Sequence, residues 1–118
     1  MSPCPCSPNC VSTDADDIDH NIPGFECVVA PTDAWRAAHA AVVALPRTTV
    51  VTDAPEYLHA ECRSAFFGFV DDLEMHLRAK QNLIAVRSAS RLGRSDFGVN
   101  KKRIEELRQS LRAQGVIR

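Results

Sequence analysis

The sequence feature that most constrains the fold is a change of periodicity at Thr48. From Thr48 to Val86, apolar and polar side chains alternate with a period of two, in segments separated by short turn sequences. Such alternation indicates strands that have one dry face and one polar face. Consecutive strands joined by short turns are normally antiparallel neighbours. We therefore expect four consecutive strands of one antiparallel sheet, over residues 48–52, 57–64, 69–78 and 83–86.

A fifth strand and a helix are expected before this sheet. Residues 25–29 alternate and read as a short strand that ends before Pro31. A helix then follows, with Thr32 or Asp33 as its N-cap and Pro46 as its end. Its expected apolar stripe has the helical spacing of three and four residues and comprises Trp35, Ala38, Val42 and Leu45.

A second helix is expected at the C-terminus, starting near Asn100 as its N-cap and stopping at Gly115. Its expected apolar face comprises Ile104, Leu107 and Leu111. The order β-α-β-β-β-β-α predicts an α+β fold: a two-layer sandwich with an antiparallel sheet of about five strands and both helices on its apolar face. The other face of the sheet would be polar and open.

Length and composition predict one domain with an irregular arm. A chain of 118 residues can bury one core. Residues 1–24, rich in Cys, Pro and Asp, lack an apolar period and read as an irregular arm, and residues 25–118 read as a single α+β domain. No apolar run approaches the roughly 20 residues of a membrane span. The expected location is cytoplasmic for the chain as written, and exported or membrane-associated if a further N-terminal segment precedes it.

The charge is distributed unevenly along the chain. Residues 1–62 hold two Lys/Arg against nine Asp/Glu, whereas residues 87–118 hold nine Lys/Arg against three Asp/Glu. This polarity fits either a basic face for an anionic partner or two halves that neutralise each other across the fold. We do not expect nucleic acid as a partner, because the chain has one Trp and one Tyr. A small anion or an acidic protein surface is the expected kind of partner.

The segment from Val86 to Arg103, VRSASRLGRSDFGVNKKR, joins the last strand to the last helix and is dense in Arg, Ser and Gly. Cations at a helix start are unfavourable unless negative charge lies nearby. One interpretation is an anion pocket made by the Arg and Ser side chains and the glycine backbone. The other is an internal brace, in which Asp71 or Asp72 of the sheet pairs with these arginines.

The cysteines near the N-terminus allow three interpretations. Cys4 and Cys10 can close a small disulfide loop, all of the thiols can be free, or Cys4, Cys6, Cys10 and His20 can bind zinc. The spacing is uncommon for a structural zinc site, and no metal is expected. Cys27 and Cys62 lie on apolar strand faces and are expected in the core.

Charged groups also gather on the polar faces of two expected strands. His59, Glu61, Glu74 and His76 could meet across the strands and bind a metal or carry out acid–base chemistry. Alternating charges on a solvated sheet face arise equally without function. No nucleophile–base–acid set and no cofactor motif is present, so we expect no cofactor and favour a protein that is not an enzyme.

Three segments together resemble a known family: CPCSPNCVST at residues 4–13, GFVDDLEMHL at 68–77 and VRSASRLGRSDFGVNKKRIEELR at 86–108. They are similar to the bacterial and plastid family known as domain of unknown function 1499, and the resemblance covers nearly the whole chain. The family implies no established activity. Cys4 and Cys10 match its opening cysteines, and Cys6 stands where its pattern has no thiol. The ligand-binding set that the resemblance and the loop composition suggest comprises Arg87, Ser88, Ser90, Arg91, Gly93, Ser95, Asp96, Gly98, Asn100 and Arg103.

The sequence thus predicts a small, non-catalytic binding or structural domain, with an anion-binding or internally braced Arg/Ser/Gly loop. A metal-dependent protein or enzyme that uses the polar sheet face is the first alternative. The second is a thiol redox or assembly role of Cys4 and Cys10.

Overall fold

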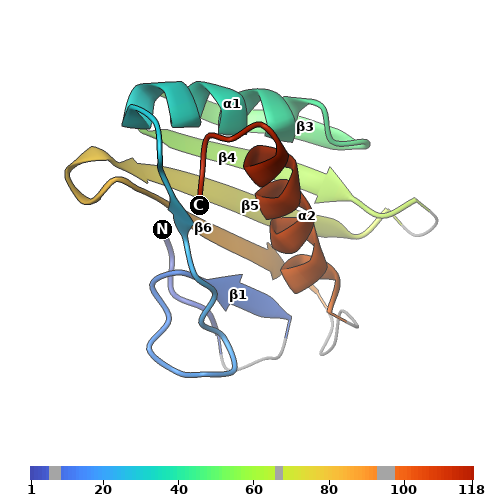
Figure 1. Ribbon diagram of the computed structural model, residues 1–118. Helices are drawn as coiled ribbons and strands as arrows, with labels where there is room; N and C mark the ends of the chain where they lie inside the picture. Colours follow the sequence, from blue (N-terminus) through green and yellow to red (C-terminus); the bar gives the residue numbers. More distant parts are fainter. Residues whose placement is uncertain (6–8, 66–67, 93–97) are drawn as a thin grey trace.

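Six strands form one antiparallel sheet in the computed structural model, and two helices cover one face of this sheet (Figure 1). The structure describes residues 1–5, 9–65, 68–92 and 98–118. Strands lie in the spatial order β1-β6-β5-β4-β3, and β2 also pairs with β6. The expected two-layer α+β fold is confirmed. The chain order is β-β-α-β-β-β-β-α, because residues expected to form only an irregular arm contribute the additional strand β1.

The four expected consecutive strands are present as β3 (Thr48–Ala54), β4 (Tyr57–Arg63), β5 (Val70–Arg78) and β6 (Leu83–Ser90), each antiparallel to the next. Their alternation has the expected phase. The side chains buried beneath the helices are Leu58, Ala60, Cys62, Asp71, Leu73, Met75, Leu77, Ile84 and Val86. A turn of 3-10 helix, η1 (Ala79–Gln81), joins β5 to β6, and the turn ends at Asn82 in the left-handed conformation.

Strand β6 runs four residues beyond the expected end at Val86. The reason is β1 (Cys10–Ser12), whose backbone pairs with the second half of β6 through Cys10↔Ala89 and Ser12↔Arg87. Strand β2 (Phe25–Glu26) pairs with the first half of β6. It is shorter than the expected strand over 25–29, because Cys27 makes only an isolated bridge to the C-terminal tail.

Both helices start differently from the expectation. Helix α1 (Pro31–Val43) begins at Pro31, with no side-chain cap from Thr32 or Asp33. Proline suits the first helical turn because the N–H that it lacks would have no partner there. Helix α2 (Val99–Ala113) is preceded by Gly98, which occupies the cap position with a left-handed φ of 78°. Asn100 is therefore not the N-cap.

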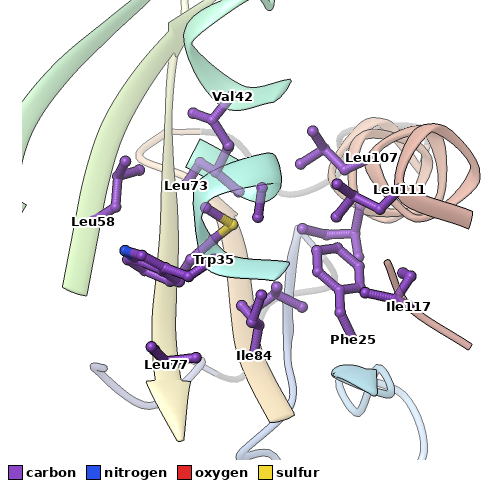
Figure 2. Close-up of a cluster of buried hydrophobic side chains, with 14 of the residues drawn as sticks. Phe25, Trp35, Val42, Leu58, Leu73, Leu77, Ile84, Leu107, Leu111 and Ile117 are labelled. Carbon is purple, nitrogen blue, oxygen red and sulfur yellow. The ribbon is translucent and has the colours of Figure 1, made fainter. Parts of the chain in front are cut away.

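The core lies between the sheet and the helices (Figure 2). Helix α1 contributes Trp35, Ala38 and Val42 of its expected stripe, and α2 contributes Ile104, Leu107 and Leu111. Helix α1 ends at Val43, before the expected end at Pro46, so Leu45 lies beyond it and is only partly buried. Phe25 and Ile117 close the core beside α2. Burial of each such large side chain contributes roughly 1.5–3 kcal/mol. Among the described residues, no helix has the length and apolar character needed to cross a membrane.

Candidate functional site

Strand β6 distributes the Arg/Ser/Gly segment over both faces of the sheet. Because residues 87–90 are extended, Arg87 lies on the open face, whereas Ser88 and Ser90 lie on the helix side. Three residues of the expected ligand-binding set, Gly93, Ser95 and Asp96, are outside the described residues. Ligand binding by the whole set stays a prediction. Its described members lie on the two faces of the sheet and make different contacts there.

On the helix side, Asn100 is the centre of a buried polar cluster. Its Oδ1 accepts a hydrogen bond from Ser88 Oγ at 2.6 Å, and its Nδ2 donates to Ser90 Oγ at 3.0 Å and to the carbonyl of Asn9 at 3.1 Å. Asn100 is only 1% exposed. The side chain thus connects the start of α2 to β6 and to the N-terminal arm, a role that a solvent-facing cap residue could not have.

Arg103 completes this cluster with an ion pair. Its guanidinium donates to Asp71 Oδ2 at 2.9 Å, to Ser88 Oγ at 3.0 Å and to Asn100 Oδ1 at 2.9 Å. Asp71 is the one charged residue on the buried face of β5, and it is 8% exposed. We call Asp71, Ser88, Ser90, Asn100 and Arg103 the helix-side brace.

On the open face, the side chain of Arg91, the residue after β6, contacts carboxylates of β5 and β4. It donates to both oxygens of Asp72 at 2.8 Å and to Glu61 Oε2 at 2.5 Å. Nε2 of His59 lies 2.7 Å from Asp72 Oδ1. The hydrogen bonds from Arg91, and next the contact with His59, lower the pKa of Asp72 to about 2. Asp72 is therefore a paired carboxylate over the whole neutral range.

A second group on the open face surrounds Glu74. Arg87 donates a hydrogen bond to Glu74 Oε2 at 3.1 Å, and the hydroxyl of Tyr57 donates one to Glu74 Oε1 at 2.6 Å. Burial, followed by the bond to Glu74, raises the pKa of Tyr57. His76 accepts a hydrogen bond from Arg78. Within the described parts of the chain, no three possible metal ligands converge. His59 and Glu61 belong to the group around Asp72 and Arg91, whereas Glu74 and His76 are bound by other partners.

The N-terminal arm is attached to the sheet covalently and by charge. Cys4 and Cys10 form a disulfide, which is the first of the three interpretations of these cysteines. Arg78 of β5 donates two hydrogen bonds of 2.7 Å to Asp14, and these lower the pKa of Asp14. Cys6 lies outside the described residues. The expected core thiol Cys62 is buried, and Cys27 is half-buried.

A cavity of about 250 Å³ opens between the ends of α1 and β4, the beginning of β3 and the first half of α2. Four cations, Arg47, Arg63, Lys102 and Arg103, line it together with one carboxylate, Glu106. Its apolar lining includes Leu45, Pro46 and Val99. We call this cavity the basic cleft.

The cations of the basic cleft are incompletely neutralised. Arg103 is paired with Asp71, whereas Arg63 lies 3.5 Å from Glu61 and Lys102 lies 3.9 Å from Glu106. Arg47 has no carboxylate partner in the described part of the chain, and its Nε donates to the carbonyl of Arg63. The first turn of α2 contains no acidic residue, so its unpaired N–H groups add positive potential.

Sequence reasoning included Arg103 in the expected ligand-binding set, but it did not connect Arg47, Arg63 or Lys102 with this cleft. Arg47 and Arg63 each stand at the end of an expected element, Arg47 directly after Pro46 and Arg63 near the end of the strand over 57–64. Only the antiparallel pairing, with Thr48 opposite Cys62, brings the two ends together. Sequence reasoning also missed a role for His39. Its Nε2 lies 2.8 Å from Asp53, and this contact connects α1 to β3.

Comparison with known proteins yields one finding. The pattern of the family described as "protein of unknown function (DUF1499)" matches residues 1–111. No curated protein and no solved structure matches the chain. Because the match covers nearly all of the 118 residues, and because the structure forms one domain from those same residues, this chain belongs to the DUF1499 family.

Proposed function

We propose that this protein is a non-catalytic binding domain that takes an anionic group in the basic cleft. The observation that carries the proposal is the excess of cations there, four against one carboxylate around a cavity of about 250 Å³. A phosphate, sulfate or carboxylate would gain charge-assisted hydrogen bonds from guanidinium and ammonium groups. Of these four cations, Arg103 is already paired with Asp71. The other three are available to a ligand, because Arg47 has no carboxylate partner in the described part of the chain, and the nearest carboxylates of Arg63 and Lys102 lie 3.5 Å and 3.9 Å away. Arg87 and Arg91 of the Arg/Ser/Gly segment have closer carboxylate partners, at 3.1 Å and 2.8 Å.

The two interpretations of the segment fit together in this proposal. The helix-side brace holds α2 against β5 and β6, and α2 in turn presents Lys102 to the cleft. Arg47 is held by its own left-handed backbone, with φ of 51°, and by its bond to the Arg63 carbonyl. Arg47, Arg63 and Lys102 are then the groups that meet the ligand.

Thermal unfolding with inorganic phosphate tests the proposal. At constant ionic strength, with chloride as the reference, phosphate should raise the Tm of the native chain, since a ligand at about ten times its Kd adds roughly 1.4 kcal/mol. Arg47→Ala and Lys102→Ala should each lose most of this increase. Lys101→Ala is the matched control, because Lys101 is an exposed neighbour that does not line the cleft. An equal phosphate effect in all three variants would exclude the basic cleft as the site.

A further inference from the structure

The loop between β1 and Asn21 presents a fully exposed aliphatic side chain among aspartates. Ile18 is 93% exposed, and its neighbours Asp16, Asp17 and Asp19 are exposed as well. Among the ion pairs of the described residues, none involves Asp16 or Asp19, whereas Asp17 contacts His20 at 2.5 Å. We call residues 13–20 the acidic loop. Its combination of an apolar tip and uncompensated negative charge is the chemistry of a recognition segment.

The acidic loop is held in one conformation by its base. The N–H of Ser12 donates to the carbonyl of His20 at 2.8 Å, and the N–H of Ile22 donates to the carbonyl of Ser12 at 3.1 Å. The side chain of Asn21 donates to the carbonyl of Ala15 at 2.9 Å. Arg78 holds Asp14. A loop ordered in this way loses little conformational entropy when it binds a partner.

The basic cleft has the complementary chemistry. Its lining combines an apolar part, Leu45 and Val99, with the incompletely neutralised cations Arg47, Arg63 and Lys102. A volume of about 250 Å³ exceeds the roughly 150 Å³ that holds one benzene molecule in a protein core, so a branched aliphatic side chain fits. An apolar tip flanked by carboxylates would therefore bury its side chain and place its charges against the cations.

The two surfaces are at different ends of the molecule. Figure 1 shows the acidic loop below and to the left of the sheet, whereas the end of β4 and the start of α2, which line the cleft, lie on the right. A molecule cannot insert its own loop into its own cleft. The contact therefore joins two different surfaces of two copies, and such a head-to-tail contact builds an open chain unless the rotation closes a ring.

We propose that the acidic loop of one copy docks in the basic cleft of a second copy, with Ile18 in the cavity and Asp16 and Asp19 facing the cations. This inference rests on the proposed function, because it names the partner of the same cleft. One inserted side chain with a small charged rim makes a weak interface, below the size of stable complexes. The association is consequently dependent on protein concentration and weakened by salt.

Sedimentation velocity with two half-blocked variants tests this. Ile18→Ala removes the tip but keeps the cleft, and Arg47→Glu combined with Lys102→Glu reverses the cleft but keeps the loop. The native chain should show a sedimentation coefficient that rises with concentration at low salt. Each variant should be monomeric, with a dissociation constant at least about tenfold higher. An equimolar mixture of the two variants should form a dimer and nothing longer, because only one functional contact can then form.

Val51→Ala and Lys101→Glu are the matched controls, since both side chains are exposed and lie outside the loop and the cleft. They should associate as the native chain does. A native chain that stays monomeric at millimolar concentration and low salt overturns the inference, as does a mixture that stays monomeric while the native chain associates. Phosphate titration of the Ile18→Ala variant separates the two proposals, because its cleft is intact and must still bind phosphate if the proposed function holds.

Discussion

Removal of Arg103 is expected to destabilise the fold more than removal of any exposed arginine. Arg103→Met keeps the aliphatic part of the side chain and deletes the guanidinium, which donates to Asp71, Ser88 and Asn100. Ser88 and Asn100 keep their mutual hydrogen bond of 2.6 Å. The carboxylate of Asp71 has no other hydrogen-bond or ion-pair partner in the described part of the chain, and Asp71 stays 8% exposed beneath α2.

The magnitude follows from the burial of this pair. Removing one partner of a buried ion pair typically costs about 3–5 kcal/mol, because the other charge stays buried without compensation. The side chain of Arg103 is 16% exposed, so water can partly reach Asp71 in the variant, and we expect about 3 kcal/mol. For a domain of this size that corresponds to a fall in Tm of roughly 10 °C. Asp71→Asn combined with Arg103→Met removes the buried charge and should lose less than the sum of the two single losses.

Urea unfolding in buffer without reductant keeps the disulfide intact and measures these losses of unfolding free energy. The fluorescence of Trp35 is the probe. Trp35 is the single tryptophan and is buried in the core, so it reports global unfolding. Arg112→Met on the exposed side of α2 is the control, with an expected loss below about 1 kcal/mol. If Arg103→Met costs less than about 1 kcal/mol, or if the double variant is additive, the helix-side brace does not hold α2 in place.

Three other features can be tested by the same unfolding measurement. The folded-state pKa of Asp72, about 2 against an ordinary 3.8, means that its pairing stabilises the fold above about pH 4. This contribution, which solvent screening reduces because the side chain of Arg91 is 45% exposed, is lost as the pH falls from about 4 to about 2, so Asp72→Asn should flatten the acid limb of the stability profile. Cys4→Ser opens the disulfide loop and should cost about 2 kcal/mol, whereas added reductant should then have no further effect. Gly98→Ala should cost about 1 kcal/mol for its positive φ alone, and Gly24→Ala should cost more, because its Cβ would lie 2.8 Å from the carbonyl oxygen of Ile84.

The alternation of side chains and the turn signals were sufficient to predict the sheet, its antiparallel order and the layer of two helices. Leu58, Ala60 and Cys62 are buried as expected because register and burial are coupled: a shift by one residue would turn the whole apolar face outward. The helix starts were wrong because local cap propensity competes with tertiary contacts. Asn100 is a good cap residue by propensity, yet its polar contacts with Asn9, Ser88, Ser90 and Arg103 place it inside α2.

The sequence alone also determined that the segment from Val86 to Arg103 is unusually rich in charged and polar residues. It indicated that acidic side chains must lie nearby to balance its cations. The sequence offered Asp71 and Asp72 as candidates, but which arginine each of them meets, and that Glu61 and Glu74 also take part, depended on the tertiary structure. Arg87 and Arg91 lie on the open face of the sheet and pair there with carboxylates. Arg103 extends from α2 and pairs with Asp71 on the helix side. The basic cleft could be identified only from the tertiary structure, because Arg47, Arg63 and Lys102 lie far apart along the chain. Their proximity is a property of strand pairing and helix packing, which no local pattern contains.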